Sequence, residues 1–155
     1  MRLLVIYLLF ACELASSQVI VRVNDAKSVK LDASSLAELP RQSAMLNDHG
    51  KQVKYEGVLL HDVLVRSGVD FGKGLRGVQL STYVAAIGSD GYQVVYALAD
   101  FDPTITNSGI ILADSRDGKP LDAKEGPLRI VVPQDKRPAR SVRLLKELDV
   151  VQLNK

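Results

Sequence analysis

The stretch "ILADSRDGKPLDAKEGPLRIVVP" (111 to 133) decides the fold, because residue types with restricted backbones fix its turns. It opens and closes with short apolar runs, which predict buried strands at 110 to 113 and at 128 to 132, the second interrupted by Arg129. Pro133 ends the second strand, so the residues that follow should form a loop at the end of a buried sheet. Between the runs, the turns are set by Gly118, Pro120, Gly126 and Pro127.

That loop carries a concentration of basic side chains that the rest of the chain lacks. The whole chain has 20 Lys and Arg against 18 Asp and Glu, for a net charge of +2. This balance excludes a chain built to coat nucleic acid, and the absence of tryptophan weakens any base-stacking role. Guanidinium and ammonium groups on a loop can hold a phosphate or another anion, so we predict an anion site. Its candidate residues are Lys136, Arg137, Arg140, Ser141 and Arg143.

The alternative is an ordinary solvated surface, which Asp135 and Glu147 would partly neutralise. Asp90 and Tyr92 are weaker candidates for the same site, because Asp90-Gly91-Tyr92 is also the pattern of a β-turn with a packed tyrosine.

Residues 1 to 17 have the pattern of an export signal. Arg2 gives a positive start, an apolar run follows from Leu3 to Ala11, and small residues precede Gln18. We therefore expect cleavage before Gln18 and a periplasmic or secreted location. The apolar run is too short for a membrane span, which needs about 20 residues.

Cys12 is the only cysteine of the chain. A mature domain over residues 18 to 155 would therefore have no thiol, which excludes a disulfide framework, a cysteine zinc site and a thiol nucleophile. In a second interpretation, residues 9 to 12 form an imperfect lipobox, and a lipidated Cys12 is the protein's contact with a membrane.

The first part of the predicted domain combines a hairpin with two short helices. Valines at 19, 21 and 23, followed by a polar turn and a second run to residue 31, predict the hairpin. Asp32 should cap a short helix that Pro40 ends. Apolar residues at 59, 60, 63 and 64 predict a second helix that begins at Gly57, and Gly68 stops it.

Strands dominate the rest of the chain. The pattern predicts two strands joined by a tight loop, at residues 78 to 87 and 92 to 98. Apolar and charged positions alternate from residue 142 to residue 153. With no repeat and no linker, the pattern predicts one α+β domain, rich in strand.

These segments carry a family resemblance that covers most of the predicted mature chain. It rests on "YEGVLLHDVLVRSGV" (55 to 69), "SDGYQVVYAL" (89 to 98), the stretch from 111 to 133, and the basic residues 140 to 143, in that order. The arrangement is similar to the molybdopterin-binding domain of the sulfite oxidase family of oxidoreductases, in a reduced, stand-alone form. The resemblance implies the β-rich fold of that domain, with a few short helices.

The resemblance also implies a ligand for the basic cluster. In the family's enzymes, a Lys-Ser-x-Lys-like segment after this strand helps to hold the anionic pterin cofactor. Arg140-Ser141-Val142-Arg143 resembles that segment, with arginine in place of both lysines. Molybdopterin is therefore a candidate cofactor for the cluster.

One departure from the family concerns the metal. In the family's enzymes a cysteine thiolate binds molybdenum from a segment that corresponds here to residues 41 to 54, and this segment contains no cysteine. The thioether of Met45 cannot replace a thiolate. His49 is expected in a solvent-facing turn and His61 on the polar side of its helix, and neither has a partner at metal-ligand spacing. We therefore assign no metal ligand and no catalytic residue.

Three functional hypotheses remain. We favour an exported, non-catalytic module with the sulfite oxidase fold and no cofactor of its own, which binds an anionic small molecule or an exported or membrane protein partner. The second is a molybdopterin-dependent oxidoreductase, or a subunit of one, so whether the chain is an enzyme stays open. The third is a structural or sensory partner of a membrane protein, with no small ligand.

Overall fold

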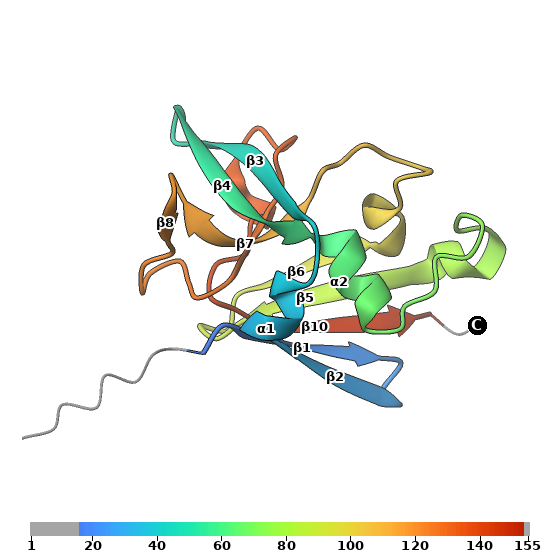
Figure 1. Ribbon diagram of the computed structural model, residues 1–155. Coiled ribbons are helices and arrows are strands. Elements are labelled where there is room, and N and C mark those ends of the chain that lie inside the picture. Colours follow the sequence, from blue (N-terminus) through green and yellow to red (C-terminus); the bar gives the residue numbers. More distant parts are fainter. Residues whose placement is uncertain (1–15, 154–155) are drawn as a thin grey trace, which may run out of the picture.

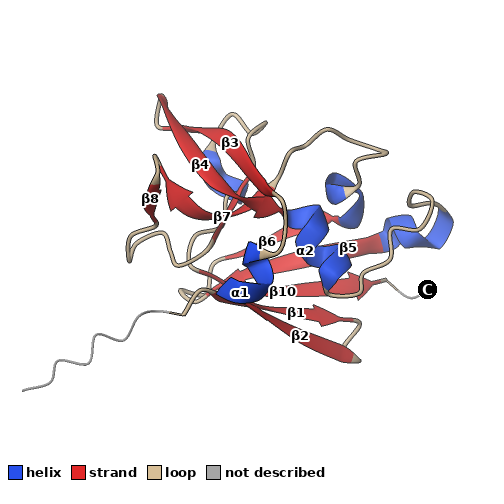
Figure 2. Ribbon diagram, viewed as in Figure 1, coloured by secondary structure: helices blue, strands red, loops and turns tan. Residues whose placement is uncertain are grey.

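A computed structural model describes residues 16 to 153, which form two five-stranded sheets (Figure 1). The β-rich α+β fold predicted from the sequence is confirmed, with short helices between long runs of strand (Figure 2). Within these residues no helix has both the length and the apolar character to cross a bilayer. The predicted export signal up to residue 15, with Cys12, lies outside the described residues.

The first sheet has the strand order β2-β1-β10-β5-β6. Its predicted hairpin is present, and both turn residues have the positive φ of a primed turn, 49° at Asn24 and 53° at Asp25. The last strand enters the middle of this sheet, parallel to β1 and antiparallel to β5. The strands are β1 (Gln18–Val23), β2 (Lys27–Asp32), β5 (Thr82–Gly88), β6 (Gln93–Ala97) and β10 (Leu145–Gln152).

The second sheet has the strand order β3-β4-β7-β8, and β9 pairs with β7 beside β8. Its pairings are antiparallel, and the β3–β4 hairpin turns at His49 and Gly50, whose φ angles are 52° and 86°. The strands are β3 (Arg41–Asp48), β4 (Lys51–Leu59), β7 (Ile111–Arg116), β8 (Lys119–Pro120) and β9 (Arg129–Val131).

Five short helices connect the strands. Asp32 caps the first as predicted, because its side chain accepts a hydrogen bond of 2.9 Å from the backbone N–H of Ser35. The helices are α1 (Ala33–Ala37), α2 (Leu60–Arg66), η1 (Gly77–Ser81), η2 (Leu98–Phe101) and η3 (Pro138–Arg140).

The main core lies between the inner face of the first sheet and α2 with the second sheet. Val21, Val84 and Leu148 from the first sheet pack in one cluster with Leu64 of α2 and Ile130 of β9. A smaller cluster lies on the other side of the second sheet. This packing fixes the ends of β5, β7 and β9, where the loops carrying the candidate residues begin.

The predicted start of the second helix is wrong by one turn. Residues 57 to 59 belong to β4, and the helix begins only at Leu60. The strand is held on both sides, because β4 pairs with β3 and with β7 through these residues. Pairing with strands distant in the sequence therefore overrides the local helical pattern.

The strand predicted from residue 78 begins only at Thr82. Residues 77 to 81 form the 3₁₀-helix η1, in which Ser81 Oγ donates a hydrogen bond of 2.7 Å to the carbonyl of Val78. Gly77 starts it with φ of 57°. The apolar residues Val78 and Leu80 are exposed here rather than buried in a sheet.

Candidate anion site

One cavity of about 700 Å³ brings most of the predicted site residues together. Its walls come from the β3–β4 turn, the β5–β6 turn, the segment before β9, and the segment that follows Pro133. These parts are far apart in the sequence, and the two sheets place them side by side. The lining residues are Asn47, Asp48, His49, Gly50, Asp90, Tyr92, Glu125, Arg129, Lys136, Arg137, Pro138, Ala139, Ser141 and Arg143.

Three of the predicted basic residues, Lys136, Arg137 and Arg143, line this cavity with exposed side chains. None of them forms an ion pair or a side-chain hydrogen bond with another residue between 16 and 153. Their donors are therefore available to a ligand.

The fourth predicted basic residue, Arg140, is turned to a different partner. Its Nε and Nη2 donate hydrogen bonds of 2.8 and 2.7 Å to the carboxylate of Asp135. The hydrogen bonds to Asp135 hold the pKa of the guanidinium above its usual range. Its guanidinium carbon also lies 5.7 Å from the centre of the Tyr96 ring. Arg140 does not line the cavity, so its place in an anion site stays a prediction that this geometry does not favour.

Ser141 lines the cavity, but its polar groups already have partners. The residue is 5% exposed, and its Oγ accepts a hydrogen bond of 3.0 Å from the backbone N–H of Val132. Its carbonyl accepts a longer one, of 3.4 Å, from Arg129 Nη2. Ser141 thus connects the basic segment, residues 136 to 143, to the end of β9.

Asp90 and Tyr92 form the β-turn that the sequence also allowed. Asp90 Oδ1 accepts a hydrogen bond of 3.0 Å from the backbone N–H of Tyr92. The Tyr92 hydroxyl donates to the carbonyl of Ala139 over 2.7 Å, and the Tyr96 hydroxyl donates to that of Arg140. Both tyrosines therefore anchor the basic segment from β6 and its turn.

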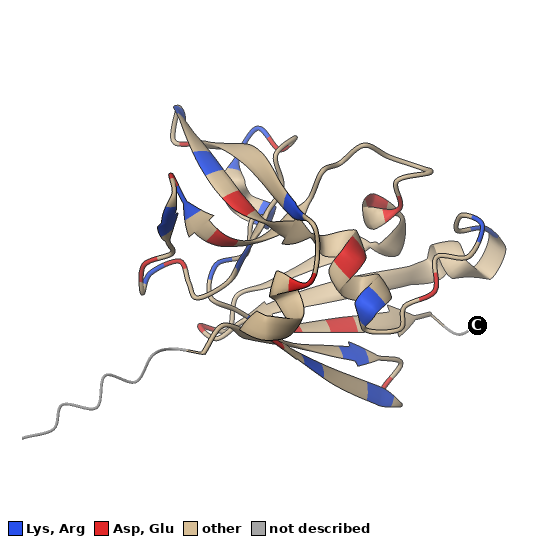
Figure 3. Cartoon of the chain, in the orientation of Figure 1, with Lys and Arg blue, Asp and Glu red and all other residues tan. Residues whose placement is uncertain are grey.

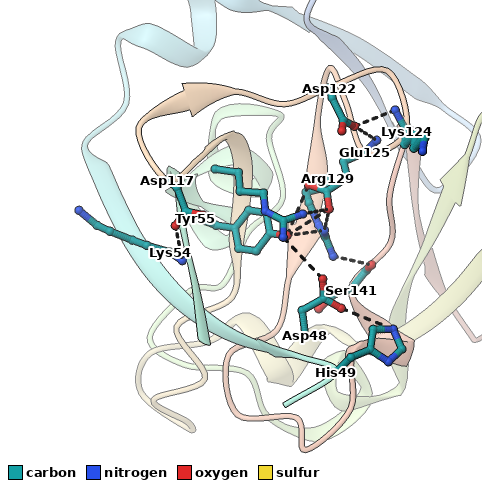
Figure 4. A network of polar contacts seen from close by, with 11 residues as sticks. Asp48, His49, Lys54, Tyr55, Asp117, Asp122, Lys124, Glu125, Arg129 and Ser141 are labelled. Carbon is teal, nitrogen blue, oxygen red and sulfur yellow. Dashed lines mark hydrogen bonds and ion pairs between the residues drawn. The ribbon is translucent and has the colours of Figure 1, made fainter. Parts of the chain in front are cut away.

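Sequence reasoning missed a buried cation in the wall of the cavity (Figure 4). Arg129 is 3% exposed, and its Nη1 lies 2.9 Å from the Tyr55 hydroxyl and 3.1 Å from Glu125 Oε1. Its Nε is buried and has no hydrogen-bond partner among the described residues. The signal was present in the sequence, because Arg129 is the one charged residue in an otherwise apolar strand.

The charges around Arg129 balance one another. Glu125 Oε1 also accepts a hydrogen bond of 2.7 Å from Arg116 Nη1, and Arg116 Nη2 lies 3.8 Å from Asp48 Oδ2. The Tyr55 hydroxyl donates to Glu125, and burial raises the pKa of this tyrosine. Two guanidinium groups and two carboxylates thus form one network beneath the cavity.

No group of three potential metal-binding side chains occurs among residues 16 to 153. His49 is exposed in its turn, as predicted, 3.7 Å from Asp48. His61 is less exposed than the polar face of a helix implies, because it packs on the Phe71 ring at 4.6 Å between centres. The segment from 41 to 54, where the resemblance implies a metal-binding cysteine, forms the β3–β4 hairpin, and its tip reaches the cavity with Asp48 and His49.

Comparison with known proteins places this geometry in a family. The model of the family described as "Oxidoreductase molybdopterin binding domain" matches residues 21–155. No curated protein matches the chain. Among solved structures, the sulfane dehydrogenase SoxCD from Paracoccus pantotrophus has a similar fold, with a TM-score of 0.65 and 15% identity. The match covers 86% of this chain and 38% of that one, so this chain spans well under half of the similar protein's length.

Proposed function

This chain belongs to the oxidoreductase molybdopterin-binding domain family, and we propose that it serves in that family as an exported module that binds an anionic small molecule. On this proposal the module performs no molybdenum redox chemistry of its own. The observation that carries the proposal is a cavity lined by the buried Arg129 and by three cations that have no partner among residues 16 to 153.

The distribution of charge around the cavity supports an anion. Acidic and basic residues are interspersed over residues 16 to 153 (Figure 3), so the preference must arise locally. The acidic residues of the lining are already engaged: Glu125 and Asp48 with arginines, and Asp90 with its own turn. The basic residues Lys136, Arg137 and Arg143 are not, which leaves the cavity with an excess of positive charge.

Molybdopterin is the anion that the family implies, and the residues fit one half of it. Lys136, Arg137 and Arg143 could hold its phosphate, and the unpartnered Nε of Arg129 offers a further donor. The molybdenum that this pterin would carry fits poorly, because the β3–β4 hairpin offers a carboxylate and an imidazole in place of the thiolate. When bound, a molybdenum cofactor supplies redox chemistry. This chain's own residues would bind and orient the pterin.

A binding titration tests the proposal. Inorganic pyrophosphate is titrated by calorimetry into the exported protein, and into the triple variant Lys136→Gln, Arg137→Gln, Arg143→Gln. We expect binding that weakens as salt rises, because the cations are solvent-exposed. The triple variant should lose affinity by roughly tenfold or more. Equal affinity in both proteins, or no binding by either, would overturn the proposal.

A molybdopterin-dependent oxidoreductase, or a subunit of one, is the second candidate. The family match and the fold shared with a sulfane dehydrogenase favour it. Protein from a host that makes the cofactor is analysed for molybdenum, and a denatured extract for pterin fluorescence. Stoichiometric metal and pterin would establish this candidate. Pterin without metal would instead support the binding module.

A further inference from the structure

The first sheet has one face in the main core and a second face whose residues belong to neither hydrophobic cluster. The core face carries Val21, Leu148 and Val84, and both α1 and α2 pack on that side. The strand register places the opposite face, here called the outer face, on the alternate residues of β1, β10, β5 and β6.

Most of the apolar residues of the outer face lie on β5 and β6, and they lie outside both hydrophobic cores. Its members are partly exposed, and the side chain of Val95 is 61% exposed. An antiparallel sheet that faces water normally carries polar residues on that side. Exposed apolar surface that is bordered by polar residues is typical of an interaction site. The apolar residues are Ile20, Tyr83, Ala85, Ile87, Val95, Ala97 and Val151.

Two carboxylates lie in the middle of this apolar surface, next to each other on β10. Glu147 and Asp149 point to the same side, and the parallel register with β1 brings Arg22 beside Asp149. In Figure 3, red marks acidic positions on β10, and blue marks a basic position on β1. Arg22 Nη1 lies 2.5 Å from Glu147 Oε1 but 3.9 Å from Asp149 Oδ1.

The single guanidinium of Arg22 is therefore the ion-pair partner of two carboxylates. Asp149 Oδ1 is buried and has no hydrogen-bond partner among the described residues, although the side chain as a whole is 28% exposed. A buried acceptor without a partner is unfavourable. Burial, together with the neighbouring Asp149, raises the pKa of Glu147. The cluster lacks one donor, and a cation from outside would supply it.

We propose that the outer face docks a partner protein that presents an arginine or lysine side chain from an apolar surface, with Asp149 as the acceptor. A second copy of this chain fits less well, because two such faces would bring four carboxylates against two arginines. The inference does not depend on the anion site, whose cavity uses none of these residues.

The test uses a photoreactive amino acid in the full chain, expressed in the cells that make it. It is placed at Val95 on the outer face, and at Met45 on the second sheet as a control of similar exposure. We expect illumination to join Val95, but not Met45, to another protein. Asp149→Lys should reduce this adduct by roughly tenfold or more. Exchanging the partner's nearest Arg or Lys for Glu should restore the adduct with Asp149→Lys.

A second variant keeps the test decisive if Asp149→Lys does not fold. Ala85 pairs with Asp149 across β10 and β5, so Ala85→Lys offers this carboxylate an internal cation and should reduce the adduct in the same way. Thermal unfolding checks that each variant is folded. The proposal is overturned if Val95 gives no adduct, if the adduct joins two copies of this chain, or if neither variant reduces it.

Discussion

Arg129 Nη1 donates a hydrogen bond of 2.9 Å to the Tyr55 hydroxyl, which joins β9 to β4 across the face of the second sheet that carries the smaller apolar cluster. The guanidinium carbon also lies 4.6 Å from the centre of the Tyr55 ring. Glu125 accepts a hydrogen bond from the Tyr55 hydroxyl and forms an ion pair with Arg129, so the wall of the cavity is held by buried polar contacts as well as by apolar packing.

We predict that Arg129→Met lowers the free energy of unfolding by about 3 kcal/mol, because it leaves a buried carboxylate with one of its partners removed. Urea unfolding at pH 7 measures the change. The double variant Glu125→Gln, Arg129→Met should recover part of the loss, since it removes the uncompensated charge. A single-variant loss within about 0.5 kcal/mol, the usual range of surface substitutions, would contradict the prediction.

The sequence predicted one part of the candidate site and missed another for a physical reason. The cluster from Lys136 to Arg143 is local, so its charge is visible in eight consecutive residues. The network around Arg129 joins residues up to 74 positions apart, and no local pattern reports which of them meet. Arg140 shows the converse, because its charge was visible but its pairing with Asp135 was not.

Arg140 and Arg143 should therefore differ in their contribution to anion affinity, although the sequence around them suggests the same role for both. We predict that Arg143→Gln weakens pyrophosphate binding, whereas Arg140→Gln leaves the Kd unchanged, since Arg140 is paired outside the cavity. The loss of that partly exposed pair should lower stability by no more than about 1 kcal/mol. Calorimetric titration and urea unfolding of both variants measure the two effects. Equal losses of affinity would place Arg140 in the site as well.

The fold was predicted best where local sequence and tertiary pairing agree. The β1–β2 hairpin has valines in alternation and a turn that accepts positive φ, so the local sequence and the strand pairing both favour it. The start of α2 was misplaced because the helical pattern extends back into residues that β4 needs for pairing. Gly57 is the first residue of the predicted helix, and in the structure it is paired with both β3 and β7.

Gly57→Ala should be strongly destabilising, because an added Cβ would lie 1.9 Å from the carbonyl oxygen of Leu112. Two paired strands would have to separate, so we expect a loss of about 3 kcal/mol or more in the free energy of unfolding. Gly50→Ala is the control, since its Cβ would meet nothing within 4 Å. Its positive φ alone should cost about 1 kcal/mol. Equal losses in the two variants would show that Gly57 has room.

Asp102 gives the chain a predicted loss of stability in acid. The residue is 1% exposed, and its carboxylate accepts hydrogen bonds from the N–H and hydroxyl of Thr104 and from the N–H of Leu75. Burial alone would raise its pKa, but these hydrogen bonds outweigh burial and lower it. A folded-state pKa below the unfolded value of about 4 means that the stabilisation is complete above pH 4 and is lost as pH falls.

Asp102→Asn should therefore be less stable than the natural protein by about 1 to 3 kcal/mol at pH 7, because the amide group cannot accept from both sides. The difference should narrow below pH 4, where the natural protein loses the same stabilisation by protonation. Urea unfolding at pH 7 and pH 3 measures it. Asp25→Asn, in an exposed turn, is the control for exchanging a surface carboxylate for an amide. A difference for Asp102→Asn that stays constant between the two pH values would show that the ionised carboxylate contributes nothing.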